Sequence, residues 1–435
     1  MIMKILNYLN VSNPNNLESD SGFIFQKLLM NSILEKKPNW EFYFLSPNKV
    51  PLQNSKIKII EVPNFKNKYQ VRFDFDWKLF ENVLYEFIDD IDLFLVNQSE
   101  QTSNFYSLVH TISKKTKIPF ITYFHYLPIH PPHVHFGYEE EASMKPFIAY
   151  IPSYPHMRVS FKKETKRTKF YEYDGTLNKG GLAEIILMRQ AEAVKLSDYS
   201  VICSNFGKKL LENYIKKHFP KIKGNYSVIP PPVSATNKKN EKIVPDDKKI
   251  IVYNHRLYRS YGTKEFLDFM THFYNNERKD FEIVFTDPTS GRSAERNGLD
   301  PDIEIFRKRI SDLQFTKILH KKTQEEYFDL VNKCYMEMGP MKTHALWSMA
   351  VVDAMICGKP TLCPNYAAFP EITGGKGGLL YSSRSDLTKK LNHMFDDAEH
   401  YTVLSDYCEK RAKLFDASVT ADKFIDIFEN AVGGS

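Results

Sequence analysis

Short apolar runs alternate with amphipathic stretches along the first half of the chain. Compact apolar runs bounded by polar residues predict buried strands, whereas apolar residues spaced three and four apart predict helices. The predicted strands lie at 3–9, 41–46, 57–63, 92–98, 119–126, 199–205 and 226–232, and the predicted helices near 21–36, 77–88, 104–115, 182–196 and 206–218. Because strands and helices alternate, we expect this half to form a parallel, doubly wound sheet.

The same alternation resumes in the second half, after a stretch at 233–248 that has almost no apolar content. Strands are predicted at 250–254, 281–287, 316–321, 334–340, 361–364 and 378–381, and helices near 263–275, 301–312, 349–357 and after the capping box of Thr323 and Glu326. The sequence therefore predicts an α/β protein with two doubly wound, Rossmann-like domains facing each other across a cleft. The expected bounds are 1–235 for the first domain, 236–248 for a linker and 249–432 for the second domain.

Composition and charge agree with a folded protein of two domains. The chain has 435 residues, of which 42% are hydrophobic and 14% aromatic, and a net charge of +6. This charge favours an anionic ligand or surface, although a nucleotide, a nucleic acid and a lipid headgroup would all serve. The five cysteines include no C-x-x-C pair, which argues against a disulfide framework or a zinc knuckle and favours the reducing cytoplasm. No apolar run is long enough for a transmembrane segment.

The segment 344–360 holds the most informative pattern in the chain. Ser348 is expected to cap a helix that Gly358 and the following proline end. The free amides of Ala350 and Val351 would then point at an anion beyond the carboxyl ends of the strands.

Asp353 is the only charged residue in this predicted helix. Its neighbours on the helix are apolar, so the carboxylate is costly to bury unless a hydrogen-bond donor meets it. A ribose diol is a suitable partner. The alternative is a partly exposed aspartate on an ordinary helix.

Cations gather directly after the strand at 250–254. They are His255, Arg256, Arg259 and Lys264, around the pair Tyr261-Gly262. Positive side chains at a strand exit and a helix start suit a diphosphate, whose charge needs more than one donor. A solvated basic turn is the alternative.

These residues together resemble the donor half of GT-B glycosyltransferases, specifically those of the retaining GT4 type. That family has a block E-x7-E-A-M-A-x-G-x-P-V, followed by P-E and G-L-L. The matching groups here are Asp353-Ala354-Met355, Gly358-Lys359-Pro360, Pro370-Glu371 and Gly378-Leu379-Leu380. The match covers about half of the second domain closely, and the first domain only by strand order and its Ser21-Gly22 loop.

The resemblance implies a nucleotide-sugar donor, most simply a UDP-sugar, with no metal and no further cofactor. It implies that Asp353 holds the ribose, that Arg256 holds the diphosphate, and that Glu371 and the loop 367–369 lie near the donor. Two positions depart from the family. Its first Glu falls at Ala345 and its phosphate Lys falls at Tyr261, so that His344, Arg259 or Lys264 would have to substitute.

The first half offers two candidates. Gly22 follows the first strand, where a glycine lets backbone amides approach a phosphate, although a simple turn explains it equally well. His125 ends the strand 119–126, where the family often has a histidine near the transferred sugar; a surface or core histidine is the alternative. A zinc site around His125 is not expected, because prolines interrupt the cluster His125, His130, His133 and His135. Asp74-Phe75-Asp76 is interpreted as a charge pair at a helix start.

The acceptor is predicted from the long segment 127–181. It carries the basic residues Lys162, Lys163, Lys166, Arg167 and Lys169, with aromatic residues between them. This pattern suits a nucleic-acid backbone with an extruded base, and an anionic membrane as well. The Lys-, Asn-, Phe- and Tyr-rich composition looks like phage coding, and T-even phages glycosylate hydroxymethylated cytosine in duplex DNA. The favoured acceptor is therefore this base, in the host cytoplasm.

Two alternatives remain open. One is a bacterial glycosyltransferase acting on a cell-surface polysaccharide or lipopolysaccharide. The other is an inactive, glycosyltransferase-like binding module, which the missing glutamate at Ala345 motivates.

Overall fold

The structure is a computed structural model. It describes residues 2–9, 17, 20–46, 50, 52, 54–62, 75–129, 134–135, 138–139, 160–161, 171–172, 179–235, 249–287, 302–320, 323–342 and 345–434. The chain divides into two compact units. The first unit comprises Met1–Leu127, Ile186–Ser234 and Phe415–Ser435, and the second comprises the rest.

The first unit is built on a seven-stranded sheet in the order β11-β10-β5-β4-β1-β2-β3, in which every pairing is parallel. Its strands are β1 (Lys4–Tyr8), β2 (Glu41–Ser46), β3 (Ile57–Glu61), β4 (Leu93–Val96), β5 (Phe120–Phe124), β10 (Tyr199–Ile202) and β11 (Tyr226–Val228). Its helices are α1 (Ser21–Lys36), α3 (Trp77–Tyr85), α4 (Thr102–Ile112), α5 (Lys179–Leu196), α6 (Asn205–His218) and α15 (Ala417–Gly433). Every strand predicted for this half is present.

Side-chain alternation along β1 explains how the helices cover both faces of this sheet. Leu6 and Tyr8 point into a buried cluster that includes Phe80 of α3 and Phe105 of α4. Asn7, between them, points to the other face and donates a hydrogen bond to Gln26 of α1. Successive side chains of a strand lie on opposite faces, so β1 is buried on both sides.

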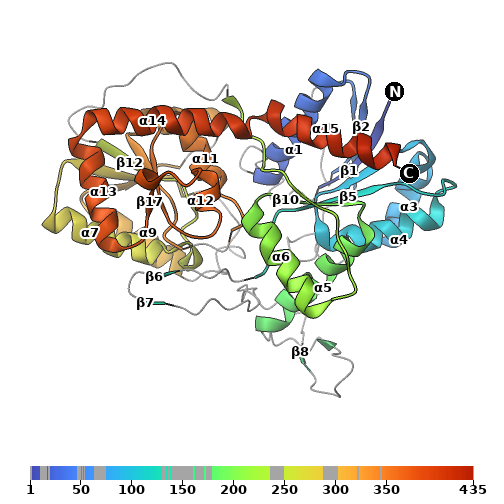
Figure 1. Ribbon diagram of the computed structural model, residues 1–435, viewed down its shortest axis with the longest axis horizontal. Coiled ribbons are helices and arrows are strands. Elements are labelled where there is room, and N and C mark those ends of the chain that lie inside the picture. The colour runs from blue at the N-terminus through green and yellow to red at the C-terminus, as the bar shows by residue number, and fades with distance from the viewer. Residues whose placement is uncertain are drawn as a thin grey trace. The chain divides into compact units, whose positions relative to one another are not determined.

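The last helix, α15, belongs to the first unit. It packs beside α1, as Figure 1 shows. Phe424 lies 6.3 Å from Phe25 and Phe428 lies 6.3 Å from Trp40, measured between ring centroids. The domain bounds 1–235 and 249–432 thus assigned the end of the chain to the wrong sheet, because the apolar face of an amphipathic helix does not reveal which sheet will cover it. The predicted linker 236–248 lies outside the described residues.

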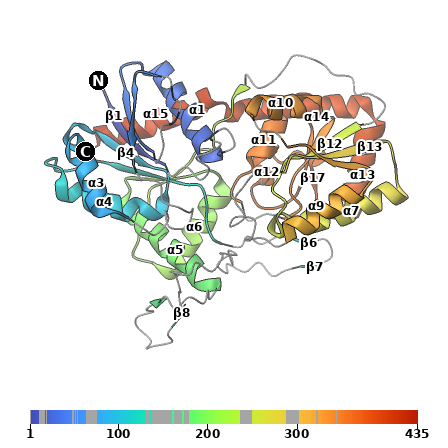
Figure 2. The same cartoon turned by 180° about the vertical axis from the view of Figure 1, so that it is seen from behind.

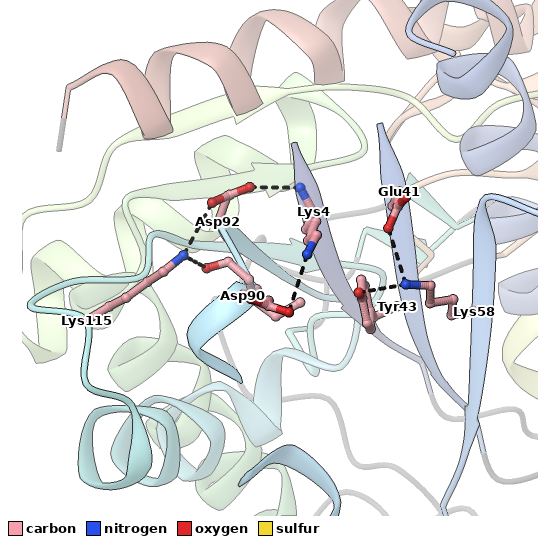
Figure 3. Close-up of polar contacts among 8 residues, drawn as sticks. Lys4, Glu41, Tyr43, Lys58, Asp90, Asp92 and Lys115 are labelled. Carbon is pink, nitrogen blue, oxygen red and sulfur yellow. Dashed lines mark hydrogen bonds and ion pairs between the residues drawn. The ribbon is translucent and has the colours of Figure 1, made fainter. Parts of the chain in front are cut away.

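The amino-terminal edge of the first sheet carries two groups of polar contacts, shown in Figure 3. One group comprises Lys4, Asp90, Asp92 and Lys115, and the other comprises Glu41, Tyr43 and Lys58. The Lys4 backbone N–H donates to Asp92 Oδ2 at 2.9 Å, and Lys58 Nζ donates to the Tyr43 hydroxyl at 2.9 Å. These groups lie at the edge opposite to the one where parallel sheets bind ligands, so we interpret them as structural.

The second unit contains a six-stranded parallel sheet in the order β14-β13-β12-β15-β16-β17. Its strands are β12 (Lys249–Tyr253), β13 (Phe281–Phe285), β14 (Thr316–Ile318), β15 (Met336–Met338), β16 (Thr361–Pro364) and β17 (Leu380–Tyr381). Its helices are α7 (Thr263–Asn276), α9 (Asp302–Asp312), α10 (Gln324–Lys333), α11 (Met349–Ile356), α12 (Phe369–Ile372), α13 (Arg384–Asp396) and α14 (Ala398–Ala412). Two small hairpins, β6-β7 (Val134–His135 and Tyr138–Glu139) and β8-β9 (Ser160–Phe161 and Tyr171–Glu172), are separate from both large sheets.

Helices cover both faces of the second sheet. Figure 2 shows α7 and α9 on one face and α10 and α14 on the other. The strand order reverses between β12 and β15, which is the doubly wound arrangement with a topological switch point. The two-domain, Rossmann-like prediction is therefore confirmed, and the switch point indicates where a ligand of this unit would bind.

Candidate functional site

The loops that leave β12 and β15 carry the polar residues at the switch point of the second unit. The two strands pair in parallel, so their carboxyl ends lie side by side. Strand β12 is followed by Asn254, His255 and Arg256, and β15 is followed by a glycine and Lys342 within the next few residues. In open parallel sheets, ligands bind beyond these ends because the diverging loops leave a crevice.

A buried hydrogen bond between His255 and Glu337 links these two strands. His255 Nε2 lies 2.7 Å from Glu337 Oε1 and 3.2 Å from the Met338 carbonyl oxygen, and both side chains are almost wholly shielded from solvent. Burial raises the pKa of Glu337, and the hydrogen bond from His255 opposes that shift. The second oxygen, Oε2, meets no hydrogen-bond partner among the described residues. Sequence reasoning did not select Glu337, although a lone charge inside the apolar run 334–340 was a visible signal.

A chain of hydrogen bonds connects Asn254 to Asp353. Asn254 Nδ2 lies 2.8 Å from the Tyr327 hydroxyl and 3.2 Å from the carbonyl oxygen of Ala350. The Tyr327 hydroxyl donates to Asp353 Oδ2 at 3.2 Å. The loop after β12 and the helices α10 and α11 are thereby joined by hydrogen bonds that end at the Asp353 carboxyl, the predicted ribose ligand. Tyr327 was not predicted, because nothing in its spacing from Asp353 marks the contact.

The Asp353 carboxyl is electrostatically unusual. It is half-buried on an apolar helix, and this burial raises its pKa from 3.8 to about 7, while the Tyr327 hydrogen bond lowers it and the charge of Glu337 raises it. Its Oδ1 accepts no hydrogen bond from the described part of the chain. Such a carboxyl combines a high cost of ionisation with an open acceptor atom, which is typical of a ligand site.

The amino end of α11 has the predicted cap. Ser348 is the N-cap, and its hydroxyl accepts from the Val351 N–H at 3.4 Å. The expectation that the Val351 amide is free for an anion was therefore wrong, because the cap already bonds it. Ala350 contributes its carbonyl oxygen to Asn254, as described above.

The cations after β12 lie in different surroundings. Arg256 is partly buried, with its guanidinium 5.9 Å from the Tyr258 ring centroid. Arg259 forms an ion pair with Asp302 at 2.9 Å, and Lys264 forms one with Asp268 at 2.8 Å, both on largely exposed side chains. The structure thus places Arg256 next to the buried His255, and the other two farther out along the turn and α7.

Gly262 makes the loops after β12 and β15 fit together. It has φ of +71°, and a Cβ at this position would stand 2.7 Å from the backbone nitrogen of Lys342. The Lys342 N–H donates to the Tyr261 carbonyl at 3.2 Å, and Lys342 Nζ pairs with Glu265 at 2.7 Å. A lysine from the second loop therefore stands beside Tyr261, the position where the GT4 pattern has its phosphate lysine. Sequence spacing could not show this, since the two residues come from different strands.

Glu371 lies on the short helix α12, after a strained residue. Ala367 adopts φ of +54°, a conformation that costs free energy outside glycine. The adjacent Tyr366 hydroxyl donates to the Met341 carbonyl at 3.3 Å, which holds this loop beside the exit of β15. The Glu371 carbonyl oxygen accepts from Arg411 at 2.7 Å. Strain of this kind is often found at ligand-binding loops.

The first unit has its own polar strand exits. His125 follows β5, and its Nε2 lies 3.1 Å from Oδ1 of Asn97, which follows β4. The side-chain nitrogen of Asn97 is buried and has no hydrogen-bond partner within the described ranges. Gly22 lies in the first turn of α1, where Asp20 caps the helix by accepting from Phe23 N–H at 3.0 Å.

Several predicted residues lie outside the described residues. They are His344, Lys162, Lys163, Lys166, Arg167 and Lys169. Within the ranges that are described, no group of three or more His, Cys, Asp or Glu side chains is arranged to hold a metal ion, and no helix is long and apolar enough to cross a membrane.

The fold is that of the GT-B glycosyltransferases. A comparison with models of known protein families finds no match, and neither does a comparison of the sequence with curated proteins. Solved structures do match over the whole chain. A sucrose-phosphate synthase from Thermosynechococcus elongatus superposes with a TM-score of 0.71 at 13% identity, covering 100% of both chains.

Two further structures are similar over nearly their whole length. HepE from Anabaena, in complex with UDP and glucose, has a TM-score of 0.64 at 10% identity and covers 98% of this chain and 100% of its own. A UDP-forming α,α-trehalose-phosphate synthase from Burkholderia vietnamiensis has a TM-score of 0.64 at 11% identity, covering 100% of both chains. At these identities the likeness establishes the fold.

Proposed function

We propose that the protein is a glycosyltransferase that moves a sugar from a nucleotide-sugar, most simply a UDP-sugar, to a hydroxyl acceptor. The observation that carries the proposal is Asp353, a half-buried carboxyl with one open oxygen at the switch point of the second unit. The similarity to solved glycosyltransferases, one of them with UDP and glucose bound, supports this function.

The second unit would supply the main contacts to the donor. The Oδ1 atom of Asp353 accepts hydrogen bonds from the ribose hydroxyls, as an ionised carboxylate has spare acceptor capacity. Arg256 pairs with the diphosphate, and Arg259, Lys264 and His344 add positive charge or donors around it. The remaining candidate contacts to the donor are Gly22, Ser348, Ala350 and Glu371.

The proposed reaction retains the anomeric configuration, as in the GT4 type. The bond from the anomeric carbon to the diphosphate oxygen breaks, and the acceptor oxygen bonds to the same face of that carbon. The acceptor proton passes to the leaving diphosphate, so no carboxylate nucleophile is required. Arg256 stabilises the charge that develops on the leaving group, and His125 contacts the transferred sugar. No metal enters this mechanism.

For the acceptor we favour hydroxymethylated cytosine in duplex DNA of the phage type. The support is the basic and aromatic composition of 161–173, which suits a phosphate backbone and an extruded base. A sugar acceptor, as the names of the similar synthases imply for those proteins, and a cell-surface glycan are the competing acceptors.

A thermal-shift panel of UDP-, GDP-, ADP- and CDP-sugars tests the donor. A ligand at a hundred times its dissociation constant stabilises the fold by about 2.7 kcal/mol, and we expect this for a UDP-sugar. A flat panel would contradict the proposal. Slow hydrolysis of the stabilising donor without acceptor separates an enzyme from an inactive binding module.

A further inference from the structure

The directions of the hydrogen bonds between Asn254 and Asp353 follow from the chemistry of their partners. The Ala350 carbonyl oxygen can only accept, so the Asn254 atom 3.2 Å from it must be the donating Nδ2. The same Nδ2 faces the Tyr327 hydroxyl oxygen at 2.8 Å. The single phenol proton of Tyr327 is therefore left for Asp353 Oδ2.

The phenol keeps that proton at neutral pH. Burial, followed by the charge of Asp353, raises the pKa of Tyr327 well above its usual value. Tyr327 is thus a permanent donor to one oxygen of the carboxyl. That contact occupies Oδ2, and the other oxygen, Oδ1, has no hydrogen-bond partner in the described part of the chain.

We propose that Tyr327 is the positioning residue that orients the Asp353 carboxylate to receive the ribose hydroxyls of the nucleotide, and that Asn254, itself bonded to the Ala350 carbonyl, holds Tyr327 in place. This inference rests on the proposed nucleotide site. Tyr327 comes from α10, Asn254 follows β12, and Ala350 is on α11, so the chain of hydrogen bonds that ends at the carboxyl joins three parts of the unit.

An oriented carboxylate gives selectivity for the ribose diol. A free aspartate side chain loses rotamer freedom when it binds, whereas one held by Tyr327 has already lost it. Removing the Tyr327 hydroxyl should therefore weaken the binding of UDP more than that of 2′-deoxy-UDP, because only UDP presents both ribose hydroxyls.

The charge of Asp353 depends on the same contact. The titratable groups that act on this carboxyl are Tyr327 of α10 and Glu337 of β15; α14, which also packs against α11, adds none among the described residues. The Tyr327 hydrogen bond favours the ionised form and Glu337 disfavours it. Without the phenol, the Asp353 carboxyl would protonate at a higher pH.

The experiment is calorimetric titration of UDP and 2′-deoxy-UDP into the wild type, Tyr327→Phe, Asp353→Asn and the double variant. We expect Tyr327→Phe to weaken UDP binding by about threefold to tenfold, which is the effect of losing one hydrogen bond. The preference for UDP over 2′-deoxy-UDP should fall in both single variants. The double variant should bind UDP no more weakly than Asp353→Asn, because both changes act on one carboxyl.

Tyr335→Phe is the matched control. The Tyr335 hydroxyl is also buried and donates to the Met394 carbonyl oxygen at 2.6 Å. Tyr335, however, directly precedes β15, so it lies at the amino end of that strand, away from the carboxyl ends where the candidate site lies. Tyr335→Phe should lower the free energy of unfolding without changing the preference for UDP over 2′-deoxy-UDP. As a second readout, carbon-detected NMR of Asp353 should show a higher carboxyl pKa in Tyr327→Phe.

The outcomes separate the two proposals. Weak UDP binding by Asp353→Asn together with wild-type affinity, selectivity and Asp353 pKa in Tyr327→Phe would overturn the role of Tyr327 alone. Unchanged UDP affinity in Asp353→Asn would remove Asp353 from the ribose site and overturn both the site assignment and this inference. No binding of UDP to the wild type would overturn both as well.

Discussion

His255 Nε2 lies 2.7 Å from Glu337 Oε1, at the base of the loops that leave β12 and β15. The histidine begins one loop, and the glutamate stands in the strand that leads to the other. Since both side chains are buried, each compensates for the loss of water around its partner. The pair therefore ties together the two strand ends on which the candidate site stands.

Removing the Glu337 carboxyl should show how far the stability of the fold depends on its contact with His255. We predict that Glu337→Ala lowers the free energy of unfolding by about 3–5 kcal/mol, because the buried histidine loses the closer of its two hydrogen-bond partners. Glu337→Gln keeps an acceptor oxygen and should cost much less. Urea denaturation at pH 7 measures both, and equal values for the two variants would show that the hydrogen bond is not the stabilising feature.

Asp353→Asn should change stability and nucleotide binding in opposite directions. The pKa of the Asp353 carboxyl is about 7 in the folded protein and near 3.8 in the unfolded chain. Between these values the folded state holds the extra proton, so the wild type loses stability as pH rises through this window and levels off above it. The variant lacks this loss.

The melting temperature of Asp353→Asn, relative to wild type, should therefore rise from pH 5 to pH 8, while its UDP affinity at pH 8 falls by about tenfold or more. Differential scanning fluorimetry at several pH values, paired with calorimetry, makes the comparison. A constant difference in melting temperature across that range would contradict the raised pKa.

Gly262→Ala should damage the site through a steric contact. Its Cβ would stand 2.7 Å from a backbone nitrogen, that of Lys342, at φ of +71°. Gly375 has the same φ of +71°, but a Cβ there would meet nothing within 4 Å, so Gly375→Ala isolates the cost of the left-handed backbone, about 1–3 kcal/mol. We predict a larger loss of stability, and weaker UDP binding, in Gly262→Ala alone. Similar losses in the two variants would mean that the loops after β12 and β15 need not approach so closely.

Arg256→Ala should reduce turnover by about a hundredfold or more in a folded protein, because it removes a charge partner of the leaving diphosphate. Arg384→Ala, at an exposed arginine that begins α13, is the control and should leave turnover unchanged. Steady-state rates with the donor identified by the thermal-shift panel provide the measurement. Wild-type kinetics in Arg256→Ala would exclude this residue from the site.

Binding to DNA should depend on salt if the favoured acceptor is right. For each phosphate contacted, the logarithm of the binding constant should fall with a slope of about −0.9 against the logarithm of the salt concentration. Replacing the basic residues of 162–169 should flatten this slope and weaken modified and unmodified duplexes equally, since phosphate contacts position without specifying sequence. Wild-type protein that binds anionic vesicles but no duplex at low salt would favour the surface-glycan acceptor.

The sequence predicted the strands well, but it predicted less well which helices cover each sheet. Buried parallel strands such as β1 and β12 are nearly continuous apolar runs, so each predicted strand is present. The helices α13 to α15 follow the last predicted strand and were not anticipated. The apolar face of such a helix does not reveal which sheet it covers, so the predicted second domain, 249–432, wrongly included the residues of α15.

The candidate site shows the same division. Asp353 stood out because it was a single charge in an apolar helix, and the Ser348 cap follows a known pattern. Tyr327 and Lys342 could not be found this way, because their contacts join residues from different strand–helix units. Glu337 is an intermediate case: its charge inside an apolar strand was visible, but its partner His255 was interpreted as one of the cations that suit a diphosphate.

The position of α15 also affects how the protein is made. The core around Phe25 and Trp40 is closed by Phe424 and Phe428, which the ribosome adds only after the residues of the second unit. At about 5–20 residues per second, synthesis of the segment between Ser234 and Phe415 takes roughly ten to forty seconds. During synthesis, apolar surface of the first unit stays uncovered while the second unit emerges, so the order of folding differs from the order of the sequence.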